Sequence, residues 1–343
     1  MPVPESSLAR EISEAPAAVA RQSKELREPV HALVARLRRM SPRVVVTCAR
    51  GSSAHAATFG KHLIERYLGI PVAAAAPNVA TVYRRGLQLD GQLFVAVSQS
   101  GRSDDLVEQS KSARAAGALT VALVNETDSP LAATCEFLLP MSAGTEQAVA
   151  ATKSLIASLA AFARLVAEWG DQRELADGLV RLPERLAQAL HLDWSPALDG
   201  LSKADALIVV GRGPTLAIAR EAALKLKETC GVQAEAYSGA EFMHGPITLV
   251  TPGYPVLLLA PTDQAAAGMA TLAIDLVAKQ AALYAAGLED SRAVHLPMLP
   301  PEQAENDAIC LVQAFYGMMP RLAALRGRNA DSPRHLQKVT RTQ

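Results

Sequence analysis

Three serines and a glutamine stand close together in the segment Ser98-Gln99-Ser100-Gly101-Arg102-Ser103. The segment follows the most hydrophobic strand-like run of the chain and precedes a helix that we expect to begin near Asp104. Loops of this kind, at the carboxyl end of a parallel sheet, are where open α/β folds bind ligands. Hydroxyls, free backbone N–H groups and a helix N-terminus together suit a phosphate, without a metal or a lysine. One serine could instead cap the helix, but capping does not need three.

Two other loops carry polar groups at predicted strand ends. Gly51-Ser52-Ser53 repeats the same geometry with fewer hydroxyls, and helix capping explains it about as well as ligand contact. Gly144-Thr145-Glu146 is followed by Ala150-Ala151-Thr152-Lys153. By residue type alone this second segment is an ordinary loop and helix start.

Acid–base chemistry could come from the predicted helix that holds Glu221, Lys225 and Glu228. Their i, i+4, i+7 spacing puts all three on one helix face. Such a stripe is usually a solvated surface. The functional alternative is that Lys225 orients or tunes Glu228 as a carboxylate base.

His244 and Lys338 are the remaining candidates. His244 lies between the apolar pair Phe242-Met243 and a Gly245-Pro246 turn, and Lys338 lies in a polar tail. A lone histidine is more often structural than catalytic, and a lysine in a tail is normally exposed to solvent. Residue type alone leaves both roles open.

The elements that must position these residues alternate between short apolar strands and helical stretches. Residues 5–40 come first, and there we expect two helices broken near Pro29. Five strand-like runs follow, at 43–48, 71–75, 93–97, 119–124 and 137–139. Helix-like stretches between several of them predict an α/β fold with a doubly wound parallel sheet.

The opening pattern returns in the second half of the chain. Two helices within 148–192, separated near Gly170-Asp171, lead through a linker at 193–196 to a new strand. Aligning Arg50-Gly51 with Arg212-Gly213 superposes strand on strand and helix on helix, so we predict two copies of one αβα unit. The second copy has predicted elements at 206–210 (strand), 218–227 (helix), 255–259 (strand), 264–282 (helix), 293–296 (apolar stretch) and 308–325 (helix).

The composition narrows the class of protein. The 343 residues include 34 Lys+Arg and 34 Asp+Glu, so the formal net charge is zero, which argues against nucleic acid or an anionic membrane as the main partner. Half of the residues are hydrophobic and 4% are aromatic, so the core must rest on Ala, Val and Leu. No apolar run reaches the roughly 18 residues that a membrane span needs, and the N-terminus has no signal pattern. We expect a soluble cytoplasmic protein.

Several kinds of site have no matching sequence motif. Four cysteines lie far apart without a C-x-x-C pair, which favours buried thiols in a reducing compartment over a zinc site or disulfides: Cys48, Cys135, Cys230 and Cys310. The P-loop, zincin and serine-esterase motifs do not occur. Gly211-Arg212-Gly213 lacks the further glycine of a dinucleotide fingerprint, so we predict no cofactor and no metal.

Together these segments resemble the sugar isomerase (SIS) family, in particular the isomerase half of glucosamine-6-phosphate synthase and stand-alone glucosamine-6-phosphate deaminases of that fold. The resemblance runs from Glu11-Ile12-Ser13-Glu14-Ala15-Pro16 to Lys338-Val339-Thr340. It implies two tandem SIS domains, each a parallel sheet flanked by helices in a flavodoxin-like αβα sandwich. We predict N-terminal helices at 1–40, a first SIS domain at 41–192 with the serine loop, and a second at 193–343 with a catalytic tail.

The resemblance also implies roles for single residues. Glu228, His244, Lys338 and Lys225 become predicted catalytic groups. The predicted substrate-binding residues are Ser52, Ser53, Ser98, Gln99, Ser100, Ser103, Val149 and Ala151. Three departures from the family pattern affect sugar stereochemistry more than phosphate binding: Arg102 stands for an acidic residue, Ala151 for a serine, and Gly239-Ala240 inverts the usual order.

The synthase of this family carries an additional glutaminase domain, and here the first cysteine, Cys48, already falls in the sugar domain. We therefore expect the degradative direction, from glucosamine 6-phosphate to fructose 6-phosphate and ammonia. The alternatives are a galactosamine-6-phosphate deaminase, a fructosyl-amine 6-phosphate deglycase, a synthase isomerase subunit without its glutaminase domain and, less favoured, a non-catalytic sugar-phosphate sensor.

The expected partners are a hexose or amino sugar 6-phosphate and a second copy of the chain. The family resemblance places His244 across a homodimer boundary, in an active site shared by two subunits. We further expect residues 331–340 to fold over the first-domain pocket as a lid, with Pro333 limiting the flexibility of the tail and Leu336 anchoring it.

Overall fold

The computed structural model describes residues 6–288 and 292–338, which form two compact units. The first-sheet unit comprises residues 17–146, 153–180 and the tail from 337. The second-sheet unit comprises the residues up to 16, 147–152 and 181–336. Each unit thus draws on separate stretches of the chain, and the predicted domain boundaries at 40 and 192 stay a prediction.

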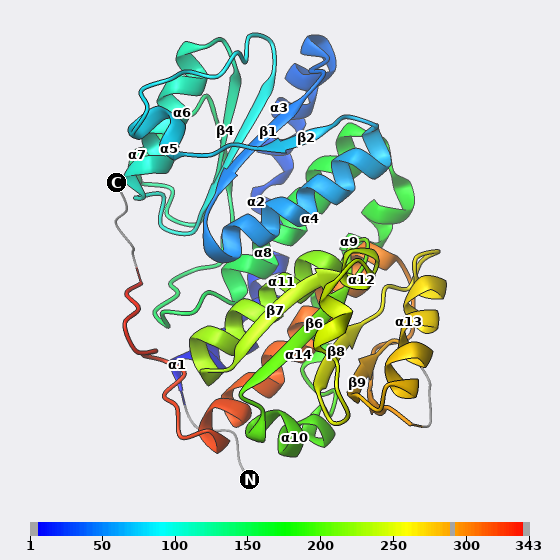
Figure 1. The fold of residues 1–343 in the computed structure, drawn as a ribbon. Coiled ribbons are helices and arrows are strands. Elements are labelled where there is room, and N and C mark those ends of the chain that lie inside the picture. The colour runs from blue at the N-terminus through cyan, green and yellow to red at the C-terminus, as the bar shows by residue number, and fades with distance from the viewer. Residues whose placement is uncertain (1–5, 289–291, 339–343) are drawn as a thin grey trace. The chain divides into compact units, whose positions relative to one another are not determined.

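The first-sheet unit is built on five parallel strands in the order β2-β1-β3-β4-β5 (Figure 1). Its strands are β1 (Val45–Ala49), β2 (Val72–Ala74), β3 (Leu93–Ser98), β4 (Leu119–Val124) and β5 (Phe137–Pro140). Every residue of β3 and β4 is buried, because helices cover both faces of a parallel sheet and the strands become continuous apolar runs.

Alternate residues of these strands face different helices. Phe94 and Ala96 of β3 pack with Leu106 of α6 in one core cluster, whereas their neighbours along the strand point to the opposite face. The helices of this unit, with α2 and α9 shared between the units, are α2 (Ala15–Glu25), α3 (Arg27–Met40), α4 (Gly51–Leu68), α5 (Asn78–Thr81), α6 (Asp104–Ala115), α7 (Pro130–Thr134), α8 (Lys153–Trp169) and α9 (Arg173–Ala189).

The second-sheet unit has five parallel strands in the order β10-β9-β8-β6-β7. They are β6 (Ala206–Gly211), β7 (Gln233–Ser238), β8 (Pro255–Leu259), β9 (Ala282–Ala286) and β10 (Val294–Leu296). The helices are α1 (Ser7–Ser13), α10 (Leu198–Lys203), α11 (Thr215–Lys225), α12 (Gly239–Met243), α13 (Ala266–Ala278) and α14 (Ala304–Leu325), with short helices η1 (Ser195–Ala197), η2 (Leu226–Cys230) and η3 (Pro246–Leu249).

The two sheets have the same topology. Taken from the other edge, the second order is β7-β6-β8-β9-β10, which matches β2-β1-β3-β4-β5 strand for strand. This is the flavodoxin-like order 2-1-3-4-5. The predicted duplication of one αβα unit and the predicted fold class are confirmed.

The structure differs from the predicted elements in several places. Residues 7–40 form three helices rather than two, and Pro29 lies in the first turn of α3, where its missing N–H has no helical partner to lose. The helix predicted over 264–282 ends at Ala278, and an alanine-rich strand, β9, follows. Strand β7 was not predicted, because this edge strand is polar and partly exposed.

Helix α14 was predicted from residue 308 and begins at Ala304. It is long and apolar enough in composition to cross a membrane, but 78% of its most apolar window is buried inside the fold, as in a core helix. All four cysteines are also buried and free, as the sequence predicted.

Candidate active site

The serine loop connects β3 to α6 and its hydroxyls hold the loop itself. The Gly101 N–H donates to Ser98 Oγ at 3.0 Å, and the Arg102 N–H donates to Ser100 Oγ at 3.3 Å. Ser103 stands at the N-cap of α6 but makes no side-chain capping bond. The capping alternative is therefore not what the structure shows, and the N-terminus of α6 keeps free N–H groups beside the loop.

Gly101 is the residue that lets the loop close on its neighbour. Its φ is 63°, and a Cβ built there would overlap the hydroxyl of Ser129. The Gln99 carbonyl accepts from the N–H groups of Asn125 and Glu126 at 3.1 and 3.2 Å, which fixes the loop backbone. A rigid loop with its hydroxyls and amides held in place is preorganised for an anion.

A second loop meets the serine loop at the same sheet edge. Strands β1 and β3 are parallel neighbours, so their carboxyl ends lie together, and α4 starts at Gly51 directly after β1. Ser52 and Ser53 occupy the first turn of α4. The Arg50 guanidinium ties the two loops together through Asp105, which is 2% exposed, with Nη2 to Oδ2 at 2.9 Å. This edge is the topological switch point of the 2-1-3-4-5 order.

The tail lysine contacts a buried carboxylate in the first-sheet unit. Lys338 Nζ lies 3.2 Å from Glu146 Oε2. Glu146 also accepts from the Ser154 N–H at 3.2 Å and from Ser154 Oγ at 2.6 Å, at the start of α8. The tail up to Lys338 is therefore attached to this unit, while Thr340 lies outside the described residues.

The anchor of the tail is not the residue that the sequence suggested. Leu336 is 41% exposed, so it does not hold the tail in an apolar contact. In the second-sheet unit Asp331 accepts from the N–H groups of Ser7 and Leu8 at 3.0 and 2.7 Å, at the N-terminus of α1. A carboxylate at a helix N-terminus is a favourable position, so the anchor is polar.

Glu221, Lys225 and Glu228 form a largely buried ionic group in the second-sheet unit. Lys225 Nζ lies 2.6 Å from Glu228 Oε2 and 3.4 Å from Glu221 Oε1. The side chains of Glu221 and Lys225 are 0% and 1% exposed, so this stripe is not a solvated surface, whereas that of Glu228 is 21% exposed. Burial lowers the pKa of Lys225, but the two carboxylates outweigh it, and the pKa is raised on balance. Lys225 is a fixed ammonium.

The helix changes its winding where Glu228 stands. After α11 the chain continues as the π-helical turn η2, and Gly231, with φ 64°, ends it. The buried Thr229 hydroxyl donates to the Lys225 carbonyl at 2.7 Å. Single π turns are frequent at functional sites, because they shift a side chain out of the regular helical register.

Glu228 lines a cavity of about 470 Å³ that three basic side chains also border. The lining residues are Lys227, Glu228, Thr229, Gly231, Gly327, Arg328, Asn329, Ser332, Pro333 and Arg334. Sequence reasoning missed Arg328 and Arg334. The only signal for them was the position of Arg334 in the tail that carries Lys338.

The structure does not bring His244 to this cavity. His244 is an exposed residue at the C-cap of α12, after the buried Phe242, and it is not among the lining residues of the cavity. Val149 and Ala151 belong to the second-sheet unit. Both are half-buried, and the residues on either side of each are buried. The carboxylate of Glu11, 1% exposed, accepts from the Ala148 N–H at 3.2 Å and holds this segment.

The comparisons with known proteins now decide the family. The SIS domain model matches residues 40–167 and 200–287, which is more than half of the chain and includes every strand of the first sheet and all strands of the second except β10. The chain belongs to the SIS domain family. The resemblance inferred from the motifs is thereby confirmed.

Two curated relatives are isomerizing glutamine–fructose-6-phosphate aminotransferases. The protein from Symbiobacterium thermophilum is 38% identical over 228 residues, which is 63% of this chain and 37% of that protein. The protein from Pyrococcus horikoshii is 31% identical over 320 residues, 89% of this chain and 52% of that protein. The chain thus spans about half or less of the length of these relatives.

Solved structures match over nearly the whole chain. A protein from Silicibacter pomeroyi DSS-3, proposed to be a phosphosugar isomerase, is 41% identical with a TM-score of 0.90, covering 95% of this chain and 99% of that one. Glucosamine-6-phosphate deaminase from Thermotoga maritima is 21% identical with a TM-score of 0.70, covering 96% and 100%. The latter likeness concerns the fold.

Proposed function

We propose that the chain deaminates and isomerises glucosamine 6-phosphate, giving fructose 6-phosphate and ammonia. The observation that carries the proposal is Glu228, a carboxylate held 2.6 Å from the ammonium of Lys225 and bordering a cavity. A buried ion pair adds little stability over an apolar core, so its presence favours chemistry. The curated relatives are named as isomerizing glutamine–fructose-6-phosphate aminotransferases.

The phosphate would bind at the edge where β1 and β3 end. The serine loop and the first turn of α4 supply hydroxyls and helix N-terminal N–H groups there, and Arg50 fixes one loop against the other. Helix N-termini favour a phosphate dianion. Ser52, Ser53, Ser98, Gln99, Ser100 and Ser103 are the proposed contacts.

Glu228 would move one proton between two carbons. His244 assists opening of the sugar ring, which exposes the C1 aldehyde beside the C2 amine. Glu228 takes the proton from C2, leaving an enolamine, and returns a proton to C1. The resulting C2 ketimine adds water and releases ammonia, so one water is consumed for each fructose 6-phosphate formed. Lys225 keeps Glu228 oriented and balances its charge.

Lys338 would act on the open-chain carbonyl, either as an imine or as a nearby ammonium. Its contact with Glu146 shows that the tail reaches the start of α8 in the first-sheet unit. We expect Lys338→Arg to abolish turnover, because a guanidinium cannot form an imine. Retained turnover would assign the ammonium role instead. Deletion from Ser332 onward should abolish turnover and leave phosphate affinity largely intact.

We also propose a homodimer in the cytoplasm, with His244 completing the partner's site. His244 is exposed and does not line the Glu228 cavity, while Met243 and Leu249 beside it are 45% and 51% exposed. Mixing His244→Ala with Glu228→Gln subunits should restore partial turnover in heterodimers. A fully active monomer in light scattering would refute the shared site.

The deciding experiment is a turnover assay with the purified chain. Glucosamine, galactosamine and N-acetylated hexosamine 6-phosphates are incubated separately, and ammonia and ketose phosphate are measured. We expect ammonia and fructose 6-phosphate from glucosamine 6-phosphate, and a loss of roughly 10²–10⁴-fold in Glu228→Gln with sugar-phosphate binding retained. No ammonia from any hexosamine phosphate would refute the deaminase.

Ala151 favours a second candidate on the same scaffold. It stands where the family pattern has a serine, so one hydroxyl contact to the sugar is missing. A galactosamine-6-phosphate deaminase or a fructosyl-amine 6-phosphate deglycase would fit this change. Adding a fructosyl-amine 6-phosphate to the panel separates these candidates. Binding of every sugar phosphate without turnover of any would instead indicate a sensor.

A further inference from the structure

A cavity of about 380 Å³ lies in the first-sheet unit, on residues that the proposed reaction does not use. Helices α2, α3, α8 and α9 supply its walls. The lining residues are Ser23, Leu26, Arg27, Val30, Arg164, Ala167, Glu168, Ala176, Leu179 and Val180. This volume is in the range of sites for small molecules.

Arg164 forms no ion pair with any residue that the structure describes. Its Nε and Nη2 atoms are shielded from solvent and have no hydrogen-bond partner among the described residues. Burial alone lowers the pKa of Arg164 to about 10, with no carboxylate contributing. The guanidinium therefore remains charged at neutral pH, although its surroundings do not compensate the charge, which is a costly arrangement for a buried ion.

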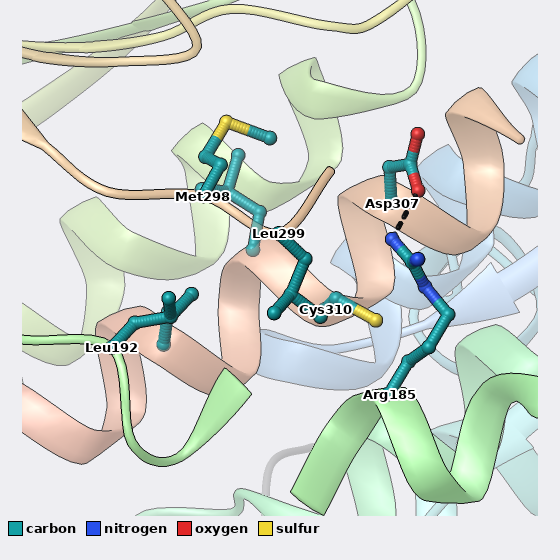
Figure 2. A pocket seen from close by; sticks show the side chains of 8 residues that line it. Arg185, Leu192, Met298, Leu299, Asp307 and Cys310 are labelled. Atoms are coloured by element: carbon teal, nitrogen blue, oxygen red, sulfur yellow. Dashed lines mark hydrogen bonds and ion pairs between the residues drawn. The ribbon is translucent and has the colours of Figure 1, made fainter. Parts of the chain in front are cut away.

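A buried arginine of the second-sheet unit shows the usual arrangement. Arg185 Nη2 lies 2.8 Å from Asp307 Oδ1 (Figure 2). Its Nη1 lies 2.8 Å from Glu302 Oε1. Thr262 donates a further hydrogen bond to Asp307 at 2.6 Å. Two carboxylates thus neutralise Arg185 within the unit, and Arg164 has no such pair.

The other side chains at the cavity form no ion pair or hydrogen bond with Arg164 among the described residues. Glu168 lines the cavity, but its carboxylate is hydrogen-bonded to His31 Nδ1 at 2.9 Å. Arg27 at the rim adds a second cation, and neither its side chain nor the Ser23 hydroxyl has a hydrogen bond within the described residues. The remaining walls are aliphatic, and Val180 is 78% exposed.

We propose that this cavity binds a small organic anion with a carboxylate or phosphate head and a compact aliphatic body. The head lies between Arg164 and Arg27, within reach of the Ser23 hydroxyl, because these groups supply positive charge and a donor. Arg164 offers Nη1, the guanidinium nitrogen that is not shielded from solvent. The aliphatic body lies against Leu26, Val30 and Leu179. The site is separate from the serine loop and from Glu228.

Calorimetric titration of the full chain tests the proposal, with isovalerate and isobutyl phosphate as probes of the two head groups. Acetate tests the need for the aliphatic body, and isovaleramide, which is neutral, tests the need for charge. We expect at least one of the two branched anions to bind at least tenfold more tightly than acetate, and isovaleramide not to bind.

Arg164→Met should abolish this binding and leave the melting temperature equal or higher, because it removes an uncompensated charge and keeps the aliphatic stem. Arg27→Gln should weaken binding several-fold. Arg39→Met, an exposed arginine of α3 outside the cavity, is the matched control and should bind as the original chain does.

Three results would overturn the proposal. Binding that persists in Arg164→Met would place the anion elsewhere. Absence of binding by both branched anions would leave the cavity without the proposed ligand. A change of oligomeric state in Arg164→Met, seen by light scattering and without anion binding in the original chain, would assign Arg164 to a contact with a second copy.

Discussion

The helix after the first strand of each repeat shows how one fold carries two kinds of core. Extending the alignment of Arg50-Gly51 with Arg212-Gly213 without a gap pairs Phe59 with Glu221 and Leu63 with Lys225. Phe59 and Leu63 are 0% exposed, as is Glu221, and Lys225 is 1% exposed. The same buried helix face is thus apolar in α4 and ionic in α11.

This difference separates what the fold needs from what the chemistry needs. An apolar pair is sufficient to pack the helix in the first-sheet unit, and buried ion pairs are often no more stable than apolar residues of similar size. The charges in α11 are therefore not required by the architecture. We attribute them to the proposed catalytic role of Glu228, which lies 2.6 Å from Lys225 and borders a cavity.

The loops that follow β1 and β6 also differ between the two repeats, but here the candidate polar groups are in the first repeat. In the first-sheet unit Ser52 and Ser53 open α4, beside the serine loop. In the second-sheet unit the aligned residues are Pro214 and Thr215, and the buried Thr215 hydroxyl donates to the Leu259 carbonyl at 2.7 Å. The second repeat thus uses this hydroxyl inside the fold, whereas we propose that the serines of the first repeat contact a ligand.

The largest effect should come from breaking the ionic core. Lys225→Met leaves Glu221 and Glu228 without their shared cation, and we expect a loss of about 3–5 kcal/mol in the free energy of unfolding. Leu63→Met at the aligned position of α4 should cost less than about 1.5 kcal/mol. Urea unfolding measures both. Equal costs would mean that the two helix faces are energetically equivalent.

The next effect concerns the closed geometry of the serine loop. Gly101→Ala places a methyl group against the Ser129 hydroxyl at a φ of 63°, so the loop must shift. We expect sugar-phosphate affinity to fall at least about tenfold, which is 1.4 kcal/mol. Gly51→Ala has a similar φ of 52° with open space around the new Cβ, so it should weaken binding less. Calorimetry compares them, and the reverse order would contradict a rigid serine loop.

A smaller effect should separate the two aligned arginines. Arg50→Gln leaves the buried Asp105 without its ion-pair partner, and we expect a loss of about 1 kcal/mol in unfolding free energy, because Arg50 is itself half-exposed to solvent. Arg212 is exposed, and no side-chain bond of it is found among the described residues, so Arg212→Gln should stay within about 0.5 kcal/mol. Thermal unfolding of both variants provides the comparison. A silent Arg50→Gln would show that the loop pair is held by the backbone alone.

The smallest difference is expected between two thiols, one from each repeat. Burial raises the pKa of Cys48 to about 12 and that of Cys230 to about 11. Both thiols should react very slowly with iodoacetamide at pH 8. As the pH rises, Cys48 should react more slowly than Cys230. The unfolded chain loses these protons at lower pH than the native one, so the free energy of unfolding should fall from about pH 9 toward 11. Rapid labelling of native Cys48 at pH 8 would contradict its burial.

Much of the fold could be predicted because buried parallel strands are short continuous apolar runs. Strand β4 was predicted at its observed bounds, and β3 within one residue. Strands β7 and β9 were missed for physical reasons: β7 is a polar edge strand, and the alanines of β9 fit a helix equally well. The orientation of an alanine-rich segment is decided by its neighbours rather than by its own propensity.

The residues of the candidate site could be predicted from their types and spacing, but their burial and their ion pairs could not. The serine loop could be found because three hydroxyls after a buried strand are unusual. The burial of Lys225 could not, because a Glu–Lys–Glu stripe has the same spacing on a solvated face and on a face packed against α14. Tyr316 of α14, whose hydroxyl donates to Glu221 at 2.8 Å, lies far away along the chain.

The sequence by itself determined the alternation of strands and helices, the duplication of the αβα unit and the positions of the serine loop and of Glu228. These depend on short-range patterns of polarity and on residue types that a loop or a helix face requires. Only the tertiary structure decided which charges are compensated. Carboxylates pair with Lys225 and Arg185, whereas no ion pair of Arg164 is found within residues 6–288 and 292–338, because ion pairing depends on distances that the order of residues does not fix.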